Sequence, residues 1–219
     1  MQGSPPRLLI VAHGTASPTG AATTVRLADA VKAARPTTVV DLCFLDVVEP
    51  RLADVLDERP TVVVPLLLST GYHVQSDIPA AVEPYTTARV ARHLGPDPLL
   101  VEALADRLGT IAPGDSVVLV GAGSSRAEAA DELADMGRLL GGRLARAVRV
   151  FTLGDDVRAE LASLAQPVRV ATYLLAEGQF VTSLQQSAEG LATVAEPIGA
   201  HPSLVQLVWK RFDDAVAAA

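Results

Sequence analysis

The sequence predicts an α/β fold made of two similar domains, each a four-stranded parallel sheet flanked by helices. Short apolar runs alternate with amphipathic stretches along the whole chain, as expected when strands and helices alternate. Runs such as TVVVPLLL contain no polar alternation, which is typical of parallel strands covered by helices on both faces. Three blocks of sequence also recur in the same order. Together these observations indicate a duplicated parallel α/β unit.

In the first half, four expected strands alternate with four expected helices. The strands are predicted at residues 8–12, 37–45, 61–68 and 88–93, and the helices near residues 21–34, 50–57, 77–84 and 98–108. Leu52, Val55 and Leu56 have the i, i+3, i+4 spacing of a helix with one buried face. Because Pro65 has no N–H to donate, its strand is expected to lie at a sheet edge or to carry a bulge.

The second half repeats this order of elements. Strands are predicted near residues 116–120, 147–153, 168–175 and 193–198, and helices near residues 126–141, 155–164, 179–189 and 202–215. LLIVAHGT (8–15) aligns with VVLVGAGS (117–124), LLSTGYHV (67–74) with LLAEGQFV (174–181), and GPDPLLVEAL (95–104) with GAHPSLVQLV (199–208). The Gly and Pro of GTIAPGD (109–115) indicate a connector. We therefore expect one domain over residues 1–112 and a second over 113–219.

Composition narrows the class of protein. Of the 219 residues, 49% are hydrophobic and 20% charged, an ordinary globular balance. The net charge of −7 and the absence of a basic run argue against a nucleic-acid partner. The single cysteine, Cys43, excludes an intramolecular disulfide and a thiolate-rich metal site. The apolar stretch near the N-terminus is too short for a signal peptide and no apolar run reaches about 18 residues, so a cytoplasmic protein without a membrane partner is expected.

Two histidines follow strands of the first predicted sheet. His13 comes directly after the first strand in AHGT, and His73 follows the third in STGYHVQSDIP. The carboxyl ends of parallel strands share one edge, where ligands bind, so the two imidazoles are expected to converge. Each histidine could alternatively be a polar loop residue. Their replacement in the second repeat by Ala122 and Phe180 favours a site retained in one half only.

Carboxylates follow the second strand. Asp46 lies in CFLDVVEP, with Glu49 three residues later. A carboxylate beside two imidazoles suits a divalent first-row metal with open positions, or a general base. Alternatively, Asp46 or Glu49 caps a helix that starts near Pro50. Spacing alone does not decide which carboxylate is used.

The remaining histidines have weaker claims to a functional role. His201 precedes Pro202 and is interpreted as the residue that starts a helix. His93 lies at the end of a predicted strand and has no histidine counterpart in the repeat.

Polar residues of the second half are candidates for substrate binding. Ser124, Ser125 and Arg126 stand at the repeat position of His13 and the residues after it. A helix N-terminus and one guanidinium there could bind a carboxylate, or a serine could form a capping box with Glu128. At the repeat positions of Thr70 and Tyr72 are two further candidates for lining the site, Glu177 and Gln179.

LLIVAHGT, CFLDVVEP and PLLLSTGYHVQSDIP, in that order, resemble the class II chelatases of the sirohydrochlorin type in their two-repeat form. The resemblance covers nearly the whole chain, with VGAGSSR and YLLAEGQF carrying it in the second half. It implies two α/β domains that face one another across a central cleft. It also implies an enzyme that inserts a divalent metal into sirohydrochlorin: iron for sirohaem, or cobalt on a route to cobalamin.

The resemblance also assigns roles to individual residues. The family's His–carboxylate–His metal pattern matches His13, Asp46 and His73, which would bind the metal and act in catalysis. The family usually has Glu where this chain has Asp46. Thr15-Ala16 stands where a Ser-Arg pair is common; Thr15 is retained as a substrate-binding candidate, and Arg126 would supply the arginine at these turns.

Several expectations concern partners and alternatives. Fe²⁺, Co²⁺ and Ni²⁺ all accept His and carboxylate ligands, and no organic cofactor is expected. Two fused repeats would build a whole cleft in one chain, which favours a monomer or a weak homodimer. The alternative function is a non-catalytic carrier of a metal or tetrapyrrole. A nucleotide-binding protein is disfavoured because neither AHGTAS nor GAGSSR completes a glycine fingerprint.

Overall fold

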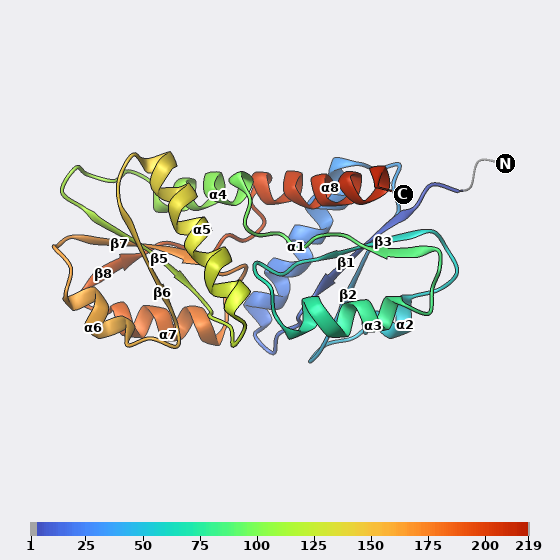
Figure 1. The fold of residues 1–219 in the computed structure, drawn as a ribbon, viewed down its shortest axis with the longest axis horizontal. Coiled ribbons are helices and arrows are strands. Elements are labelled where there is room, and N and C mark those ends of the chain that lie inside the picture. Colours follow the sequence, from blue (N-terminus) through green and yellow to red (C-terminus); the bar gives the residue numbers. More distant parts are fainter. Residues whose placement is uncertain (1–3, 219) are drawn as a thin grey trace.

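The computed structural model describes residues 4–218, which form two parallel sheets side by side (Figure 1). The first half contains β1 (Arg7–Ala12), α1 (Pro18–Ala34), β2 (Val40–Phe44), α2 (Leu52–Val55), β3 (Thr61–Pro65), a π-helical turn (His73–Asp77), α3 (Ile78–Val82), β4 (Ala88–Val90) and α4 (Pro98–Leu108). The second half contains β5 (Ser116–Gly121), α5 (Ala127–Leu144), β6 (Val148–Thr152), α6 (Val157–Ala162), β7 (Val168–Tyr173), α7 (Gln179–Ala188), β8 (Ala192–Val194) and α8 (Pro202–Ala217).

The two sheets have the same topology, with strand orders β2-β1-β3-β4 and β6-β5-β7-β8, and all their pairings are parallel. The predicted fold of two four-stranded α/β domains is confirmed. The division into residues 1–112 and 113–219 stays a prediction, and residues 1–3 and 219 of those ranges lie outside the described part.

The expectation for Pro65 was wrong. The β3 strand is interior, between β1 and β4, and its pairing with β1 runs without a bulge up to Pro65 opposite Val11. Pro65 is tolerated because it is the last residue of the strand, so its missing N–H falls at the end of the ladder rather than within it.

Helices cover both faces of each sheet, which explains the continuous apolar strands. All six residues of β1 are buried. Leu8 and Ile10 pack on the side of α1 and α8, whereas Leu9 and Val11 pack with residues of α2 and α3. The largest apolar cluster contains Ile10 of β1 together with residues of the second half. The two halves therefore share part of their core.

The last helix of each half is exchanged. The α4 helix packs against β7 and α5 of the second half, and α8 packs against β3 and α1 of the first (Figure 1). Arg107 of α4 donates to the Ile198 carbonyl, and Arg211 of α8, at the equivalent repeat position, donates to the carbonyls of His93 and Leu94. The repeat pattern did not predict this exchange. It ties the two halves together and thereby fixes the space between them.

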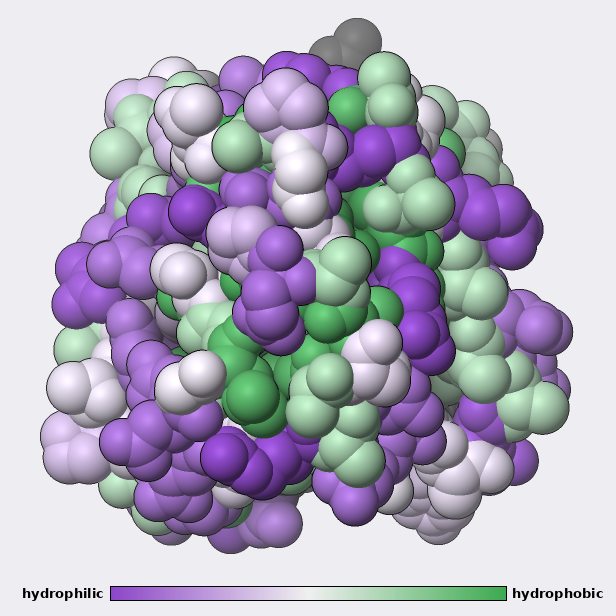
Figure 2. Space-filling view, turned by 90° about the vertical axis from the view of Figure 1, so that its left-hand side faces the viewer, coloured by the Kyte–Doolittle hydropathy of each residue, from purple (hydrophilic) through white to green (hydrophobic). Residues whose placement is uncertain are grey.

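The outer end of the second half, opposite the meeting point of the sheets, shows mainly hydrophilic side chains around a central apolar area (Figure 2). Among the described residues, no helix is both long and apolar enough to cross a bilayer.

Candidate functional site

A cleft of about 590 Å³ lies where the carboxyl ends of the two sheets meet. Its lining includes Ala12 at the end of β1, Leu66 just after β3, and Gly121 and Tyr173 at the ends of β5 and β7. The volume is in the range of small-molecule sites, and ligands of parallel sheets bind at this edge. The cleft between facing domains, expected from the resemblance, is present.

The predicted site residues divide into two groups. Those that line the cleft are His13, Thr15, Ser124, Glu177 and Gln179. His73, Asp46, Ser125 and Arg126 lie outside this lining.

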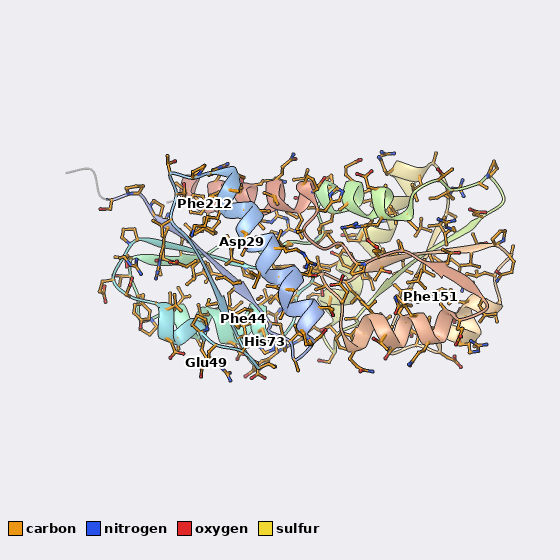
Figure 3. The ribbon with its side chains drawn as sticks, turned by 180° about the vertical axis from the view of Figure 1, so that it is seen from behind. Asp29, Phe44, Glu49, His73, Phe151 and Phe212 are labelled. Atoms are coloured by element: carbon orange, nitrogen blue, oxygen red, sulfur yellow. The ribbon has the colours of Figure 1, made fainter. Side chains whose placement is uncertain are left out.

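The two predicted histidines lie close together beside the cleft. The ring centroids of His13 and His73 are 4.8 Å apart, with the rings at 79°. His73 lies near the middle of the molecule, where the halves meet, whereas Glu49 lies further out on the first half (Figure 3). The expectation that the imidazoles converge is met by this geometry.

Gly14 allows this arrangement. It has φ +95°, and a Cβ there would lie 2.0 Å from the Asp46 carbonyl oxygen, so a side chain would clash with backbone. The close approach lets the Asp46 N–H donate to the His13 carbonyl at 2.9 Å. The turn after β1 is thereby held against the turn after β2.

His73 is the first residue of a π-helical turn rather than part of a loop, and this turn runs directly into α3. The helix predicted near 77–84 corresponds to α3, Ile78–Val82, and the π-helical turn precedes it. The turn brings the Asp77 carboxylate to 2.5 Å from Nδ1 of His73. An Nδ1–H that donates to a carboxylate leaves the Nε2 lone pair free for a metal. Asp77 was not identified from the sequence, although it lies four residues after His73.

Asp46 does not join the histidines in a closed metal site. Its Oδ1 accepts from the Val47 N–H at 2.8 Å and from Arg51 at 3.2 Å, and its side chain is 60% exposed. The Val47 N–H and the Arg51 guanidinium hold the pKa of this carboxyl below its usual value. Within residues 4–218, no three His, Cys, Asp or Glu side chains are grouped closely enough to hold a metal.

The helix caps considered for Asp46, Glu49 and the serines near Glu128 do not form in the structure. The α2 helix begins at Leu52 with Arg51 as its N-cap, so neither Asp46 nor Glu49 caps it. The N-cap of α5 is Arg126, with no side-chain cap hydrogen bond, and Ser124 Oγ accepts from the Arg126 N–H at 3.2 Å. The structure therefore has no capping box with Glu128. His201 is the N-cap of α8, as predicted.

Glu177 is held against the opposite half. Its carboxylate accepts from Thr23 Oγ1 of α1 at 2.7 Å. Burial alone would raise the pKa of Glu177, but the bonds from Thr23 and its own backbone N–H, with the nearby charges of Arg26 and Arg107, lower it. Glu177 is thus an ionised group in the cleft wall.

A buried polar cluster that the sequence analysis missed lies behind the cleft. Glu132 of α5 accepts from the Thr70 N–H at 2.6 Å, from Thr70 Oγ1 at 2.8 Å and from His93 Nε2 at 3.0 Å. Tyr173 donates to the Leu68 carbonyl at 2.9 Å. Burial lowers the pKa of His93 and raises that of Tyr173. Glu132 and Thr70 are 62 residues apart in the chain, so no local pattern pointed to them.

Comparison with known proteins extends this picture. Residues 7–111 match the CbiX family model. The chain is 24% identical to a sirohydrochlorin ferrochelatase of Priestia megaterium, over 92% of this chain and 87% of that protein.

Solved structures share the fold over nearly the full length. SirB from Bacillus subtilis, solved with Fe³⁺, has a TM-score of 0.81 and 23% identity over 95% of this chain and 94% of that one. A cobalt complex of the sirohydrochlorin chelatase SirB from Bacillus subtilis subspecies spizizenii has a TM-score of 0.82 and 22% identity, with 95% and 94% of the two chains covered.

A structure of CbiX, described as the terminal enzyme for biosynthesis of sirohaem in denitrifying bacteria, gives a TM-score of 0.74 and 21% identity over 95% of this chain and 99% of that one. The resemblance of this chain to the class II chelatases of the sirohydrochlorin type is therefore confirmed, through the CbiX family model over its first half and through relatives over almost its whole length.

Proposed function

We propose that this protein is an enzyme that inserts a divalent metal ion, Fe²⁺ or Co²⁺, into sirohydrochlorin in sirohaem or cobalamin biosynthesis. The observation that carries the proposal is the pair of imidazoles, His13 and His73, 4.8 Å apart beside a cleft of about 590 Å³. The relatives named as sirohydrochlorin chelatases, with iron or cobalt, support the choice of substrate.

Both histidines act on the metal and on the protons that it replaces. Insertion releases two pyrrole N–H protons while the metal exchanges its water ligands for ring nitrogens. Neutral imidazoles bind first-row divalent metals and accept protons near neutral pH. Asp77, bonded to His73, keeps that ring in one orientation.

Asp46 is the third proposed metal ligand and catalytic group. Its lowered pKa keeps it ionised, and its 60% exposure leaves it open to an incoming cation. Its position next to the His13 backbone supports this role. To reach a metal between the imidazoles, the carboxylate exchanges its bond with Arg51 for the cation.

The walls of the cleft offer apolar surface to the macrocycle, and groups beside the cleft are proposed to bind its carboxylates. Leucines of both halves, such as Leu68, Leu133 and Leu174, offer apolar surface. We assign substrate contacts to Thr15, Ser124, Ser125, Arg126, Glu177 and Gln179. Ser125 and Arg126 lie beside the lining residue Ser124, at the start of α5, where backbone N–H groups and the guanidinium favour anions.

We also propose which metals the protein uses, how it assembles and where it is located. Ni²⁺ is included among the metal substrates, and no organic cofactor is required. A monomer or weak homodimer, with domains over 1–112 and 113–219, suffices because both walls come from one chain. The net charge of −7 argues against nucleic acid, and a cytoplasmic location without membrane attachment is proposed.

The decisive experiment follows the absorption spectrum of sirohydrochlorin after addition of Fe²⁺, Co²⁺ or Ni²⁺, with and without the purified protein. Catalysis predicts faster metal insertion than in the uncatalysed mixture, with many turnovers per protein. A shift that stops at one equivalent would instead identify a non-catalytic carrier of the metal or the tetrapyrrole.

A further inference from the structure

The segment Leu68–Thr70, which leads from β3 to the turn carrying His73, is held by side chains of the other half. Tyr173 Oη donates to the Leu68 carbonyl at 2.9 Å, and Ser124 Oγ donates to the Thr70 carbonyl at 3.5 Å. Glu132 accepts from both the N–H and the hydroxyl of Thr70. The backbone of Thr70 is therefore bonded on its N–H side and its carbonyl side by the second half.

Glu132 makes the strongest of these contacts. Its side chain is 19% exposed and receives three hydrogen bonds, the third from His93, whose side chain is 9% exposed. Hydrogen bonds to a carboxylate are short and strong, and they gain strength where water is excluded. Such a contact fixes the two groups that it joins more firmly than a surface ion pair does.

The position of Thr70 determines where the metal-binding turn begins. His73 is three residues further on, and the Gln75 N–H already donates to the Gly71 carbonyl at 3.1 Å. A Cβ at Gly71 would meet no atom within 4 Å, so there is open space on the side of this residue where a side chain would lie. The turn is thus bonded to the second half just before its start, through Thr70, whereas the contact between His73 and Asp77 lies within the turn itself.

We propose that Glu132 is a positioning residue for His73. The half that lacks the histidines holds one of them at the distance from His13 that metal binding requires. This inference rests on the proposed function, because it assumes that His73 binds the metal. It assigns Glu132 no contact with metal or tetrapyrrole.

The experiment measures Co²⁺ binding to the metal-free protein by calorimetry, without tetrapyrrole. His73→Ala identifies the heat that belongs to the histidine site. Glu132→Ala should weaken Co²⁺ binding about tenfold, roughly the effect of one lost hydrogen bond to a charged group. Glu132→Gln should bind nearly as tightly as wild type, since its amide oxygen can accept from the Thr70 N–H while its NH₂ faces the Thr70 hydroxyl and His93.

Two further variants separate positioning from stability. Asp97→Asn removes a different buried carboxylate that bonds across the halves, to Lys210 and Arg211, and should leave Co²⁺ affinity unchanged although it destabilises the fold. If Glu132→Ala does not fold, Thr70→Val, which deletes one hydrogen bond, should weaken Co²⁺ binding a few-fold, while Thr70→Ser keeps wild-type affinity.

The outcomes are distinguishable. Wild-type affinity in Glu132→Ala overturns the inference, and so does equal weakening in Glu132→Ala and Asp97→Asn. Equal weakening in Glu132→Gln and Glu132→Ala would show that charge rather than geometry matters, which also overturns it. Unchanged Co²⁺ binding in His73→Ala would contradict the proposed function itself, and with it the role of Glu132.

Discussion

Thr23 and Glu132 stand at equivalent positions of the two repeats, 109 residues apart, and each bonds to the opposite half. Thr23 donates to Glu177, and Glu132 accepts from Thr70, whose repeat equivalent is Glu177. The same threonine–glutamate contact thus occurs twice with the two residue types interchanged. In both repeats this contact joins the two halves. Only the contact between Glu132 and Thr70 lies next to a turn that carries a proposed metal-binding histidine, His73.

The first prediction concerns the histidine pair. His13→Ala and His73→Ala should each reduce the rate of metal insertion about 100-fold or more, the scale of a lost acid–base group. The double variant should be little worse than either single one, because residues that act as a unit are strongly non-additive. Insertion is followed by absorbance.

His201→Ala is the matched control for the pair. His201 caps α8 and contacts Asp106, so its loss should lower stability while the insertion rate changes little. Full activity in either His13→Ala or His73→Ala would refute the metal-site assignment.

The second prediction concerns Arg126. Arg126→Ala should raise the KM for sirohydrochlorin roughly tenfold, the value of about one charge-assisted hydrogen bond, with a smaller change in kcat. A carboxylate contact made equally in the ground and transition states has this effect. Steady-state kinetics provide the test; an unchanged KM with a collapsed kcat would show that Arg126 does not hold substrate.

The third prediction concerns Asp97 and pH. Burial alone would raise the pKa of Asp97, but Lys210, the Leu99 N–H and Arg211 together lower it below its usual value near 3.8. Its contribution to stability is therefore complete above about pH 4, and it is lost as the pH falls through the folded-state pKa.

Asp97→Asn leaves the buried Arg211 without its carboxylate, which should cost about 3 kcal/mol of unfolding free energy at pH 7. The difference between wild type and variant should shrink below about pH 4. Denaturant titrations at several pH values measure it. A constant difference down to pH 3 would contradict the assigned pKa direction.

The fourth prediction concerns Val47. This residue has φ +66°, although it is β-branched, and the Val48 N–H donates to the Asp46 carbonyl across it. Such a backbone is strained for any residue except Gly. Val47→Gly should therefore raise the free energy of unfolding by about 1 kcal/mol, measured by denaturant titration. Ala in place of Val47 keeps the strain and should give no such gain.

Local sequence patterns indicated which segments form strands and helices, how the two repeats align, and which histidines are candidates for the site. Strand and helix periodicities depend on near neighbours, and the segments that leave the carboxyl ends of parallel strands begin at one edge of the sheet. This is why His13 and His73 were identified as candidates, and Ser124 and Glu177, also candidates, line the cleft.

Only the tertiary structure decided how the two halves are joined. The exchange of α4 and α8, the contact of Glu132 with Thr70, and the attachment of Asp46 to Arg51 rather than to a histidine depend on how side chains pack in three dimensions. A hydrogen bond between residues 62 positions apart leaves no periodic signal in one sequence. The residue types at the site could therefore be predicted. The contacts that orient these side chains form only when the two sheets and their exchanged helices pack together.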